Sequence, residues 1–543
     1  MATYDTSNQP PPFEDVNLFT ANPALARAVS SFGAAAQTEG LATYGRWAGA
    51  AETIAQGRLA NANPPRLVAV DARGDRRDEV LFHPAYHYFM TEGFAHGLHC
   101  SGFQPGGVPA GGGAQVARSA KVNMLSQVEA GHVCPLTMTH ASIPALADAA
   151  ADNPAAERWL SRIFSRDYDS RFAPAAEKTG VTLGMGMTEN QGGTDVRSND
   201  TTARAADGAY VIEGQKWFMS APMCDAFLIL AQAKGGLTCF ILPRFDEDGR
   251  RNGLEFQRLK DKLGNRSNAS SEVVFNKARA FCLGEEGRGV PTIIRMVTQT
   301  RLDCAASAAG IAFQALAQAI HHARHRRVFQ KRLVDQPLMQ SVLGDMALDV
   351  MAATAAATRL AASFDRADTH EAEAAYRRIL TPAVKYWACK LPPRVAVEAM
   401  ECLGGNGYIE DFPLALIYRE APLNGIWEGP GNVMALDLLR AAFREPDAVE
   451  QVIGGLVAAT NGHDAARKTA GDIASALKAG EGRARTAAEK LALLAAFAAM
   501  VEAGDPFAEH FAEVRLGGDY GASYGTGIDG GGEALIEAAM PGR

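Results

Sequence analysis

The sequence predicts an α+β protein of several domains, in which an all-β region separates two helical ones. The chain has 543 residues, more than a single hydrophobic core usually supports. Helical patterns fill residues 1–180 and 290–443, whereas short β-branched runs separated by turn residues fill residues 181–289. A fourth region, residues 444–543, is Ala-rich and helical and ends in a Gly-rich tail. These four ranges are the predicted domains, and the all-β one has the strand spacing of a small barrel or sandwich.

Each region contains recognisable elements. In the first, helices are expected over residues 24–33 and 41–61, and Pro64-Pro65 ends the second helix. Six glycines and two prolines in residues 102–113 predict a loop between helices. Long helices are expected over residues 302–327 and 338–365, and the tail over 517–532 is expected to be poorly ordered. Strands are expected over residues 181–187, 210–213, 227–232, 237–242 and 272–275.

Composition narrows the kind of protein. A net charge of -8 argues against a chain that coats nucleic acid along its whole surface. The eight cysteines form no CxxC pair, which predicts reduced thiols, and no signal peptide or membrane-spanning run is recognisable. We therefore expect a cytoplasmic protein. His83 and His87 are four residues apart, but no acidic residue lies between them as in a zincin, so packing histidines are expected rather than a metal site.

Two segments of the β region carry residues suited to a flat ligand. In residues 187–195, Met-Thr-Glu-Asn-Gln-Gly-Gly-Thr-Asp, the paired glycines let the backbone approach a ligand, and the two threonines offer hydroxyl groups. A hairpin loop with a polar tip explains this segment equally well. Residues 214–220, Gly-Gln-Lys-Trp-Phe-Met-Ser, place aromatic rings and a hydroxyl at the end of a strand, a combination suited to stacking on a flat ring.

Both segments resemble the acyl-CoA dehydrogenase family. The first is similar to its Thr-Glu-Pro-x-Ala-Gly-Ser-Asp signature and the second to its Asn-Gly-x-Lys strand. The resemblance implies the fold of that family, an N-terminal helical domain, a central β-barrel and a C-terminal helical bundle, here with an extra helical C-terminal domain. It also implies FAD as the cofactor, with Phe218 and Ser220 over the isoalloxazine. The residues of this region implied to bind FAD are Met187, Thr188, Gly193, Thr194, Phe218 and Ser220.

Segments of the second helical region fit the same family. The basic end of the helix at residues 322–329 would by itself be a solvated terminus favoured by the helix macrodipole. The Arg-x-x-Phe pattern of the family falls on Arg326 and Phe329, followed by Gln336, and these residues are implied to reach the FAD of a neighbouring subunit in a homotetramer. The turn at residues 401–408 resembles the family's Gln-x-x-Gly-Gly-x-Gly-[Tyr/Phe], with Glu401 in place of Gln. The further cofactor contacts implied are Gly404, Gly405, Gly407 and Asn432.

Glu428, in the tetrapeptide Ile-Trp-Glu-Gly of residues 426–429, is implied to be the catalytic base. A lone Glu before Gly is usually a surface residue, but this one follows four family segments in the correct order. The resemblance implies that it removes the α-proton of an acyl-CoA while a hydride leaves the β-carbon for flavin N5. Other members carry the base at the position of Thr300, which cannot serve as one. The substrate pocket is expected to include Arg301, Trp427 and Gly429.

Residues 57–65, 127–131 and 258–270 resemble the AidB-like branch of the family, flavoproteins of the adaptive response to alkylation damage. That branch implies weak dehydrogenase activity and protection of DNA through a basic C-terminal domain. Residues 444–543 instead hold nine Lys and Arg against fifteen Asp and Glu, a net charge of −6, which disfavours DNA binding. Two alternatives stay open: a DNA-damage-associated flavoprotein with incidental dehydrogenase activity, and a flavin oxidase on a non-CoA substrate, although that group typically carries Asp as its base.

Overall fold

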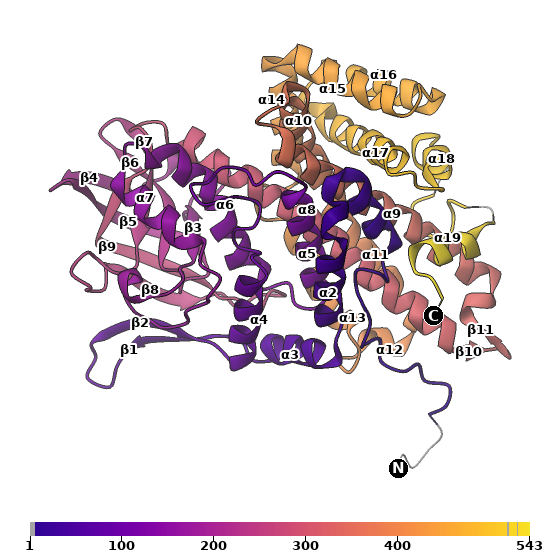
Figure 1. Cartoon of the computed structure of the whole chain (residues 1–543), viewed down its shortest axis with the longest axis horizontal. Helices are drawn as coiled ribbons and strands as arrows, with labels where there is room; N and C mark the ends of the chain where they lie inside the picture. Colours follow the sequence, from indigo (N-terminus) through magenta and orange to yellow (C-terminus); the bar gives the residue numbers. More distant parts are fainter. Residues whose placement is uncertain (1–5, 519–520, 529, 543) are drawn as a thin grey trace. The chain divides into compact units, whose positions relative to one another are not determined.

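The computed structural model describes residues 6–518, 521–528 and 530–542. Its residues form two compact units, which are described separately. The strand unit comprises Ala55–Ala110 and Glu129–Thr300, and the helical unit comprises Met1–Ile54, Gly111–Val128 and Arg301–Arg543. Figure 1 shows the elements of both. Each unit is assembled from stretches that lie far apart in the sequence.

A seven-stranded sheet forms the centre of the strand unit. Its pairings run from β3 to β5, β9, β7, β6 and back to β3, so the sheet closes on itself as a barrel. The all-β prediction for this region is confirmed, although β4 and β8, which are rich in Ala and charged residues, were not predicted. The strands are β3 (Leu183–Thr188), β4 (Thr202–Ala206), β5 (Ala209–Ser220), β6 (Ala226–Ala233), β7 (Gly236–Pro243), β8 (Leu254–Leu259) and β9 (Ser270–Cys282).

Three helices accompany the sheet in this unit: α4 (Pro84–Ala95), α6 (Val133–Ala150) and α7 (Pro154–Ile163). Helix α6 lies beside β3, where the Thr139 hydroxyl accepts a hydrogen bond of 3.0 Å from Leu183 N. The strands β1 (Arg66–Val70) and β2 (Arg76–Leu81) form a hairpin. The sequence predicts a helical domain over residues 1–180, and this hairpin corrects that prediction. Its turn is fixed locally, because the Asp71 carboxylate accepts hydrogen bonds from Arg73 N and Asp75 N.

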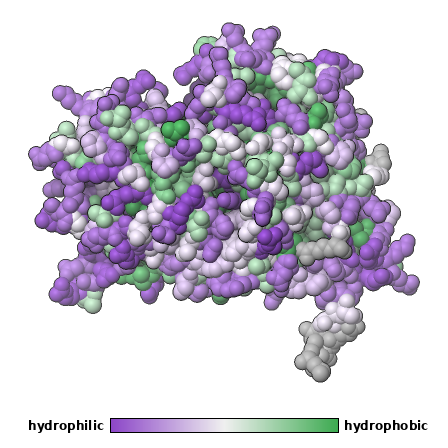
Figure 2. Space-filling model, in the orientation of Figure 1, coloured by the Kyte–Doolittle hydropathy of each residue, from purple (hydrophilic) through white to green (hydrophobic). Residues whose placement is uncertain are grey.

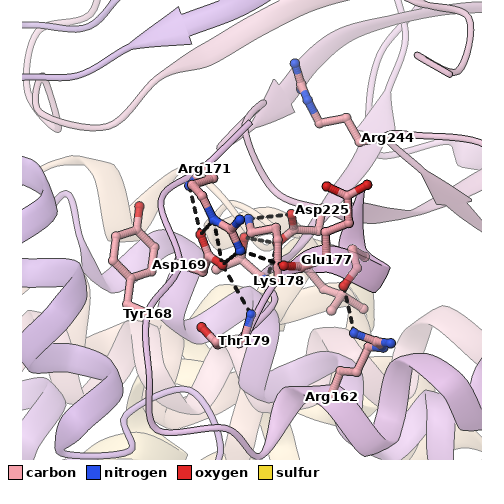
Figure 3. Close-up of polar contacts among 12 residues, drawn as sticks. Arg162, Tyr168, Asp169, Arg171, Glu177, Lys178, Thr179, Asp225 and Arg244 are labelled. Carbon is pink, nitrogen blue, oxygen red and sulfur yellow. Dashed lines mark hydrogen bonds and ion pairs between the residues drawn. The ribbon is translucent and has the colours of Figure 1, made fainter. Parts of the chain in front are cut away.

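An irregular segment joins α7 to β3 and is fixed by charged side chains (Figure 3). The Lys178 ammonium lies 2.6 Å from Asp225 Oδ1, and both side chains are buried. The other carboxylate oxygen of Asp225 accepts a hydrogen bond of 2.8 Å from Thr182 N. Upstream, Asp169 binds the Arg171 guanidinium and accepts a bond from Thr179 N. These contacts hold the segment that leads into the first strand of the barrel.

The helical unit contains an Ala-rich helical core. Ala residues of α8 and α9 are almost fully buried, which lets neighbouring helices approach closely; a Cβ added at Gly310 of α8 would lie 2.1 Å from Asn123 O of α5. The long helices predicted over residues 302–327 and 338–365 correspond to α8 and α9. The helices of this unit up to residue 444, with α3 and α8 divided between the two units, are α1 (Pro23–Val29), α2 (Thr38–Ala48), α3 (Ala51–Ala62), α5 (Ala114–Ser126), α8 (Gly289–His325), α9 (Pro337–Arg366), α10 (Glu371–Ala388), α11 (Leu391–Leu403), α12 (Gly405–Tyr408), α13 (Leu414–Glu420) and α14 (Gly431–Arg444).

The single helix expected over residues 41–61 is instead two helices, α2 and α3, that meet at Gly49. The N-terminal segment runs against this position: Val16 N donates to Gly49 O at 3.2 Å. A Cβ at Gly49 would lie 1.8 Å from Val16 O, so only glycine fits here. This tertiary contact interrupts a sequence pattern that is helical on both sides.

Further helices follow residue 444: α15 (Pro446–Ala459), α16 (Asp464–Lys478), α17 (Ala484–Glu502), α18 (Ala508–Phe511) and α19 (Gly532–Ala539). Helix α17 is buried over most of its length, whereas hydrophilic residues are prominent on the outer helices α15 and α16 in the view of Figure 2. No helix of the described residues is long and apolar enough to cross a membrane.

The Gly-rich tail is packed where the structure describes it, which corrects the expectation of poor order; residues 519, 520 and 529 lie outside the described residues. Arg515 binds Asp349 at 2.7 Å and Asp345 at 2.5 Å, and all three side chains are buried. The second carboxylate oxygen of Asp345 accepts a hydrogen bond of 2.9 Å from Gly525 N, and Tyr524 OH donates to Asp349 at 3.0 Å. We call this arrangement the tail clamp (Asp345, Asp349, Arg515, Tyr524, Gly525).

Candidate active site

The two motif segments of the strand unit lie on neighbouring strands. Antiparallel pairing of β3 with β5 sets Thr188 opposite Phe218 and Gly186 opposite Met219. Ser220, the last residue of β5, is paired with Ser270 of β9. The residues predicted from the two segments to bind one ligand are therefore brought together at one end of two strands.

The loop after β3 exposes its backbone. Glu189 and Gly192 exchange main-chain hydrogen bonds, which folds residues 189–192 into a tight turn. Gly192 has a φ of +136°, and no atom lies within 4 Å of where its Cβ would be. A Cβ at Gly193 would lie 2.4 Å from the Thr188 hydroxyl oxygen, so this hydroxyl lies against bare backbone. Gly193 and Thr194 are exposed. Such a loop can accept a ligand that approaches main-chain N–H groups.

A buried ion pair that the sequence interpretation missed connects the two segments. Lys216 of β5 is 1% exposed, and its ammonium lies 2.5 Å from Glu189 Oε1 and 2.9 Å from Leu230 O. The other Glu189 oxygen accepts a hydrogen bond of 2.7 Å from Asp200 N. Burial lowers the pKa of Lys216, and Glu189 opposes that shift. Both residues lie in the motifs of residues 187–195 and 214–220, so the sequence contains them. The spacing of these motifs does not show that the two side chains face inward together.

Adjacent aromatic side chains stand at the end of β5. Phe218 is 46% exposed and Trp217 is 37% exposed. The Lys260 ammonium lies 3.4 Å from the centroid of the Trp217 ring and 4.6 Å from that of Phe218. An exposed ring of this kind offers the apolar face that a flat aromatic ligand needs for stacking.

In the helical unit, Glu428 lies in a turn between α13 and α14. Its φ is +57°, in the left-handed region that side chains other than Asn, Asp and Gly seldom adopt, and Gly429 follows with a φ of +100°. Arg301 Nε donates to Glu428 O at 3.1 Å, and Arg301 is itself held by Asp437 at 2.8 Å. Arg301 is predicted to be a pocket residue, and its contacts are with the main chain of the proposed base and with the Asp437 carboxylate.

Trp427 packs inward beside Glu428. Its ring lies against a cluster of Cys304, Ala308 and Cys389, and its indole N–H donates to Asn424 Oδ1 at 2.9 Å. Asn424 in turn donates to the Ser307 hydroxyl at 3.0 Å. These contacts give Trp427 a role in holding the turn; that it also lines the substrate pocket remains a prediction.

The predicted cofactor residues downstream of α8 are largely at the surface. Phe329 is 88% exposed at the tip of the hairpin β10 (Arg327–Val328) and β11 (Lys331–Arg332), and Gln336 Nε2 donates to Val328 O at 3.1 Å. Arg326 Nη1 donates to Asn8 O at 2.9 Å. Asn432 is exposed at the start of α14.

The turn of residues 404–408 presents bare backbone. Gly404 has a φ of +63°, and no atom lies within 4 Å of a Cβ placed at Gly404 or Gly405. Gly407 is required for a different reason, since its Cβ would lie 2.3 Å from Met400 O. Glu401 is exposed. The turn therefore offers open backbone at two positions and close helix packing at a third.

The histidines considered for a metal have other partners. His83 caps α4 by accepting a hydrogen bond of 3.1 Å from Ala85 N, and His87 lies 3.2 Å from Tyr168 OH. Within the described ranges, no group of three or more His, Cys, Asp or Glu is arranged to hold a metal ion.

Comparison with known proteins gives matches along most of the chain. The adaptive response protein AidB N-terminal domain matches residues 8–170, the acyl-CoA dehydrogenase middle domain residues 184–278, and the acyl-CoA dehydrogenase C-terminal domain residues 287–443. AidB of Escherichia coli (strain K12) is 46% identical over 446 residues, 82% of this chain and 81% of that protein. Acyl-CoA dehydrogenase family member 11 of Caenorhabditis elegans is 31% identical over 401 residues, 71% of this chain and 63% of that protein.

Solved structures share the fold. The crystal structure of Caenorhabditis elegans ACDH-11 in complex with C11-CoA has a TM-score of 0.83 at 24% identity, over 99% of this chain and 93% of that one. The apo form of Bd2924 has a TM-score of 0.82 at 26% identity, over 92% of this chain and 100% of that one. The first alignment extends beyond residue 443, so the additional C-terminal helices belong to the shared fold.

Helical domains before and after a central barrel define the fold class of the acyl-CoA dehydrogenases, FAD-dependent oxidoreductases that act on acyl-CoA. The chain belongs to the acyl-CoA dehydrogenase family, in the branch that carries the AidB N-terminal domain. Its cofactor is FAD. Residues of the strand unit fit this group: the exposed Phe218 ring offers a stacking face, and the open backbone at Gly192 leaves room for phosphates.

Proposed function

We propose that this protein oxidises an acyl-CoA thioester between its α and β carbons, with Glu428 as the base. The proposal depends on one observation, the fixed conformation of the turn at Glu428. Glu428 has a left-handed φ in the family motif, and its carbonyl oxygen accepts a hydrogen bond of 3.1 Å from Arg301. A base must be fixed in one orientation to act on a weakly acidic C–H bond. The presence of C11-CoA in the ACDH-11 crystal structure supports an acyl-CoA as substrate.

In this proposal the chain supplies binding and proton transfer. Thr188, Gly193 and Thr194 hold the flavin, and Phe218 stacks on its ring. When bound, FAD supplies the acceptor for the hydride that leaves the substrate's β-carbon. The Glu428 carboxylate accepts the α-proton, and its backbone N–H donates to the thioester oxygen as negative charge develops there. Met187, Ser220 and Asn432 complete the cofactor contacts, and Gly429 with Trp427 borders the acyl group.

We further propose a homotetramer in which Arg326, Phe329 and Gln336 reach the FAD of a neighbouring subunit, together with Gly404, Gly405 and Gly407. Four large apolar residues of the helical unit support this, because each is more than four-fifths exposed: Phe329 88%, Leu338 85%, Tyr408 82% and Phe443 87%. Apolar side chains left in water at this level are typical of surfaces that another subunit covers. We expect the assembly to be cytoplasmic.

The test is anaerobic titration of the purified flavoprotein with acyl-CoAs of different chain length, followed by the loss of oxidised-flavin absorbance. We expect bleaching by at least one thioester and none with Glu428→Gln. Glu445→Gln is the matched control, since Glu445 is exposed at the other end of α14. If no thioester bleaches the flavin, the proposal is wrong; bleaching by a nitroalkane instead would favour the oxidase, and salt-sensitive retention of duplex DNA the damage-associated flavoprotein.

A further inference from the structure

A buried cation lies beneath the turn that carries Glu428. Lys385 is on α10 and is 1% exposed. Its ammonium donates to Trp427 O at 2.9 Å and to Gly429 O at 2.6 Å, the carbonyls on either side of Glu428. No sequence motif quoted above includes this residue, and the mechanism proposed above does not use it.

With Arg301, Lys385 holds three consecutive carbonyl groups. Those of Trp427 and Gly429 point to the ammonium, and that of Glu428 points to the Arg301 guanidinium at 3.1 Å. A left-handed φ at a Glu is unfavourable and persists only where the surroundings impose it. Charge-assisted hydrogen bonds to carbonyls are about twice as strong as neutral ones, so this pair of cations can impose it.

The burial of Lys385 needs a reason, because removing an ammonium from water is costly and an apolar residue would fill the same space without that cost. Its acceptors are main-chain oxygens of the turn, so the ammonium offsets the cost of its burial by stabilising the conformation of the turn. Lys385 and Glu428 also act electrostatically on one shared neighbour, Cys304. Burial raises the pKa of the Cys304 thiol, Lys385 lowers it and Glu428 raises it.

We propose that Lys385 is a positioning residue that fixes the turn of Trp427, Glu428 and Gly429 and thereby the orientation of the Glu428 carboxylate. The inference rests on the proposed function of Glu428 as base. Its structural part, that the ammonium holds the turn, can be measured without any turnover.

The experiment compares wild type with Lys385→Met, which keeps an unbranched side chain one atom shorter and removes the charge, and with Lys385→Arg, which keeps a cationic donor. Arg515→Met is the matched control, because it removes a buried cation of the helical unit from the tail clamp rather than from the turn. Two quantities are measured for each holoprotein: the rate constant of flavin reduction as a function of acyl-CoA concentration, which gives its saturating value and the dissociation constant, and amide hydrogen exchange over residues 423–431.

We expect Lys385→Met to slow flavin reduction about 100-fold, the loss that a small misplacement of a catalytic group causes, while the dissociation constant for acyl-CoA stays within about threefold. Amide exchange over residues 423–431 should rise about tenfold. Lys385→Arg should lie between Lys385→Met and wild type, and Arg515→Met should match wild type in both quantities.

Unchanged exchange in Lys385→Met overturns the inference whatever happens to the rate, and so does an equal rise in Arg515→Met. Raised exchange with an unchanged rate also overturns it, because the turn would then move without affecting the base. Failure of the proposed function has a different signature: no acyl-CoA reduces wild type, or Glu428→Gln is as fast as wild type. Raised exchange confined to Lys385→Met would then still establish that the ammonium holds the turn.

Discussion

The Lys216 ammonium lies 2.5 Å from the Glu189 carboxylate inside the barrel, and this contact joins the loop after β3 to β5. Removing one partner of a buried ion pair costs about 3–5 kcal/mol, because the other charge stays buried without compensation. We expect Glu189→Gln to lower the free energy of unfolding by this amount and to release flavin, measured by thermal unfolding and by flavin absorbance relative to protein. Glu213→Gln changes an exposed residue of β5, the strand that carries Lys216, and should change neither the free energy of unfolding nor the flavin content. Retention of flavin by Glu189→Gln would show that the pair does not shape the loop.

The hydrogen bond from Trp427 to Asn424 is expected to stabilise the turn that carries Glu428. In Trp427→Phe the Asn424 oxygen loses this donor while Asn424 stays 3% exposed, at a cost of about 1–3 kcal/mol. A double-mutant cycle with Asn424→Ala, followed by urea unfolding, isolates the interaction energy between the two side chains. We expect a coupling energy above about 0.5 kcal/mol. Additive losses would mean that Trp427 stabilises the turn by packing alone.

The tail clamp should be separable from the flavin site. Arg515→Met leaves two buried carboxylates, Asp345 and Asp349, and is expected to loosen the segment after residue 515. Limited chymotrypsin digestion should then cleave after Tyr524, a residue of the clamp, faster than in wild type, while flavin content stays the same. Arg467→Met, which removes an exposed ion pair with Asp464, is the control, and its tail should be cleaved at the wild-type rate. Loss of flavin from Arg515→Met would contradict this separation.

His322 makes the helical unit sensitive to acid. Burial, together with Arg326, His321 and His325, lowers the pKa of His322 to about 4, whereas an unfolded His titrates near 6.5. The neutral ring is therefore preferred in the folded state. Its contribution to stability is complete above about pH 6.5 and is lost as pH falls from there to about 4. Urea midpoints measured across this range should decline less in His322→Gln than in wild type, with His325→Gln, an exposed neighbour, close to wild type. Parallel decline in all three would assign the acid sensitivity to other groups.

Duplex DNA should bind weakly. The net charge of −6 over residues 444–543 opposes the phosphate backbone, and basic residues there already have partners, such as Arg467 with Asp464 and Arg485 with Tyr386 OH. We expect fluorescence anisotropy of a labelled duplex to show no saturable binding near physiological salt, about 0.15 M. Saturable binding that weakens steeply as salt rises would contradict the prediction and favour the DNA-damage alternative.

The sequence predicted what depends on local pattern. Helix content on both sides of the barrel, the strands around residues 227–242 and the two motif segments all follow from periodicity, turn residues and family resemblance. The break at Gly49 and the hairpin β1–β2 did not, because each depends on a contact or a turn within a pattern that is helical nearby. The same limit applies to the Gly-rich tail. Its own composition does not show that carboxylates of α9, far away in the sequence, hold it in place.

The site shows a similar division. The sequence identified the residues expected to touch cofactor or substrate, since these types recur in motifs. It did not identify Lys385 or the pairing of Lys216 with Glu189, which act on backbone and loops. A buried lysine looks the same in a sequence as an exposed one, and only the fold reveals what its ammonium binds.

The tail clamp also bears on the order of events during synthesis. Asp345 and Asp349 are in α9, but the guanidinium that neutralises them belongs to Arg515, 170 and 166 residues further on. Until that part of the chain leaves the ribosome, two carboxylates would have to enter an apolar helix layer uncompensated, which is strongly unfavourable. We therefore expect α9 to stay loosely packed until translation has passed residue 515 and the last helices can complete the bundle.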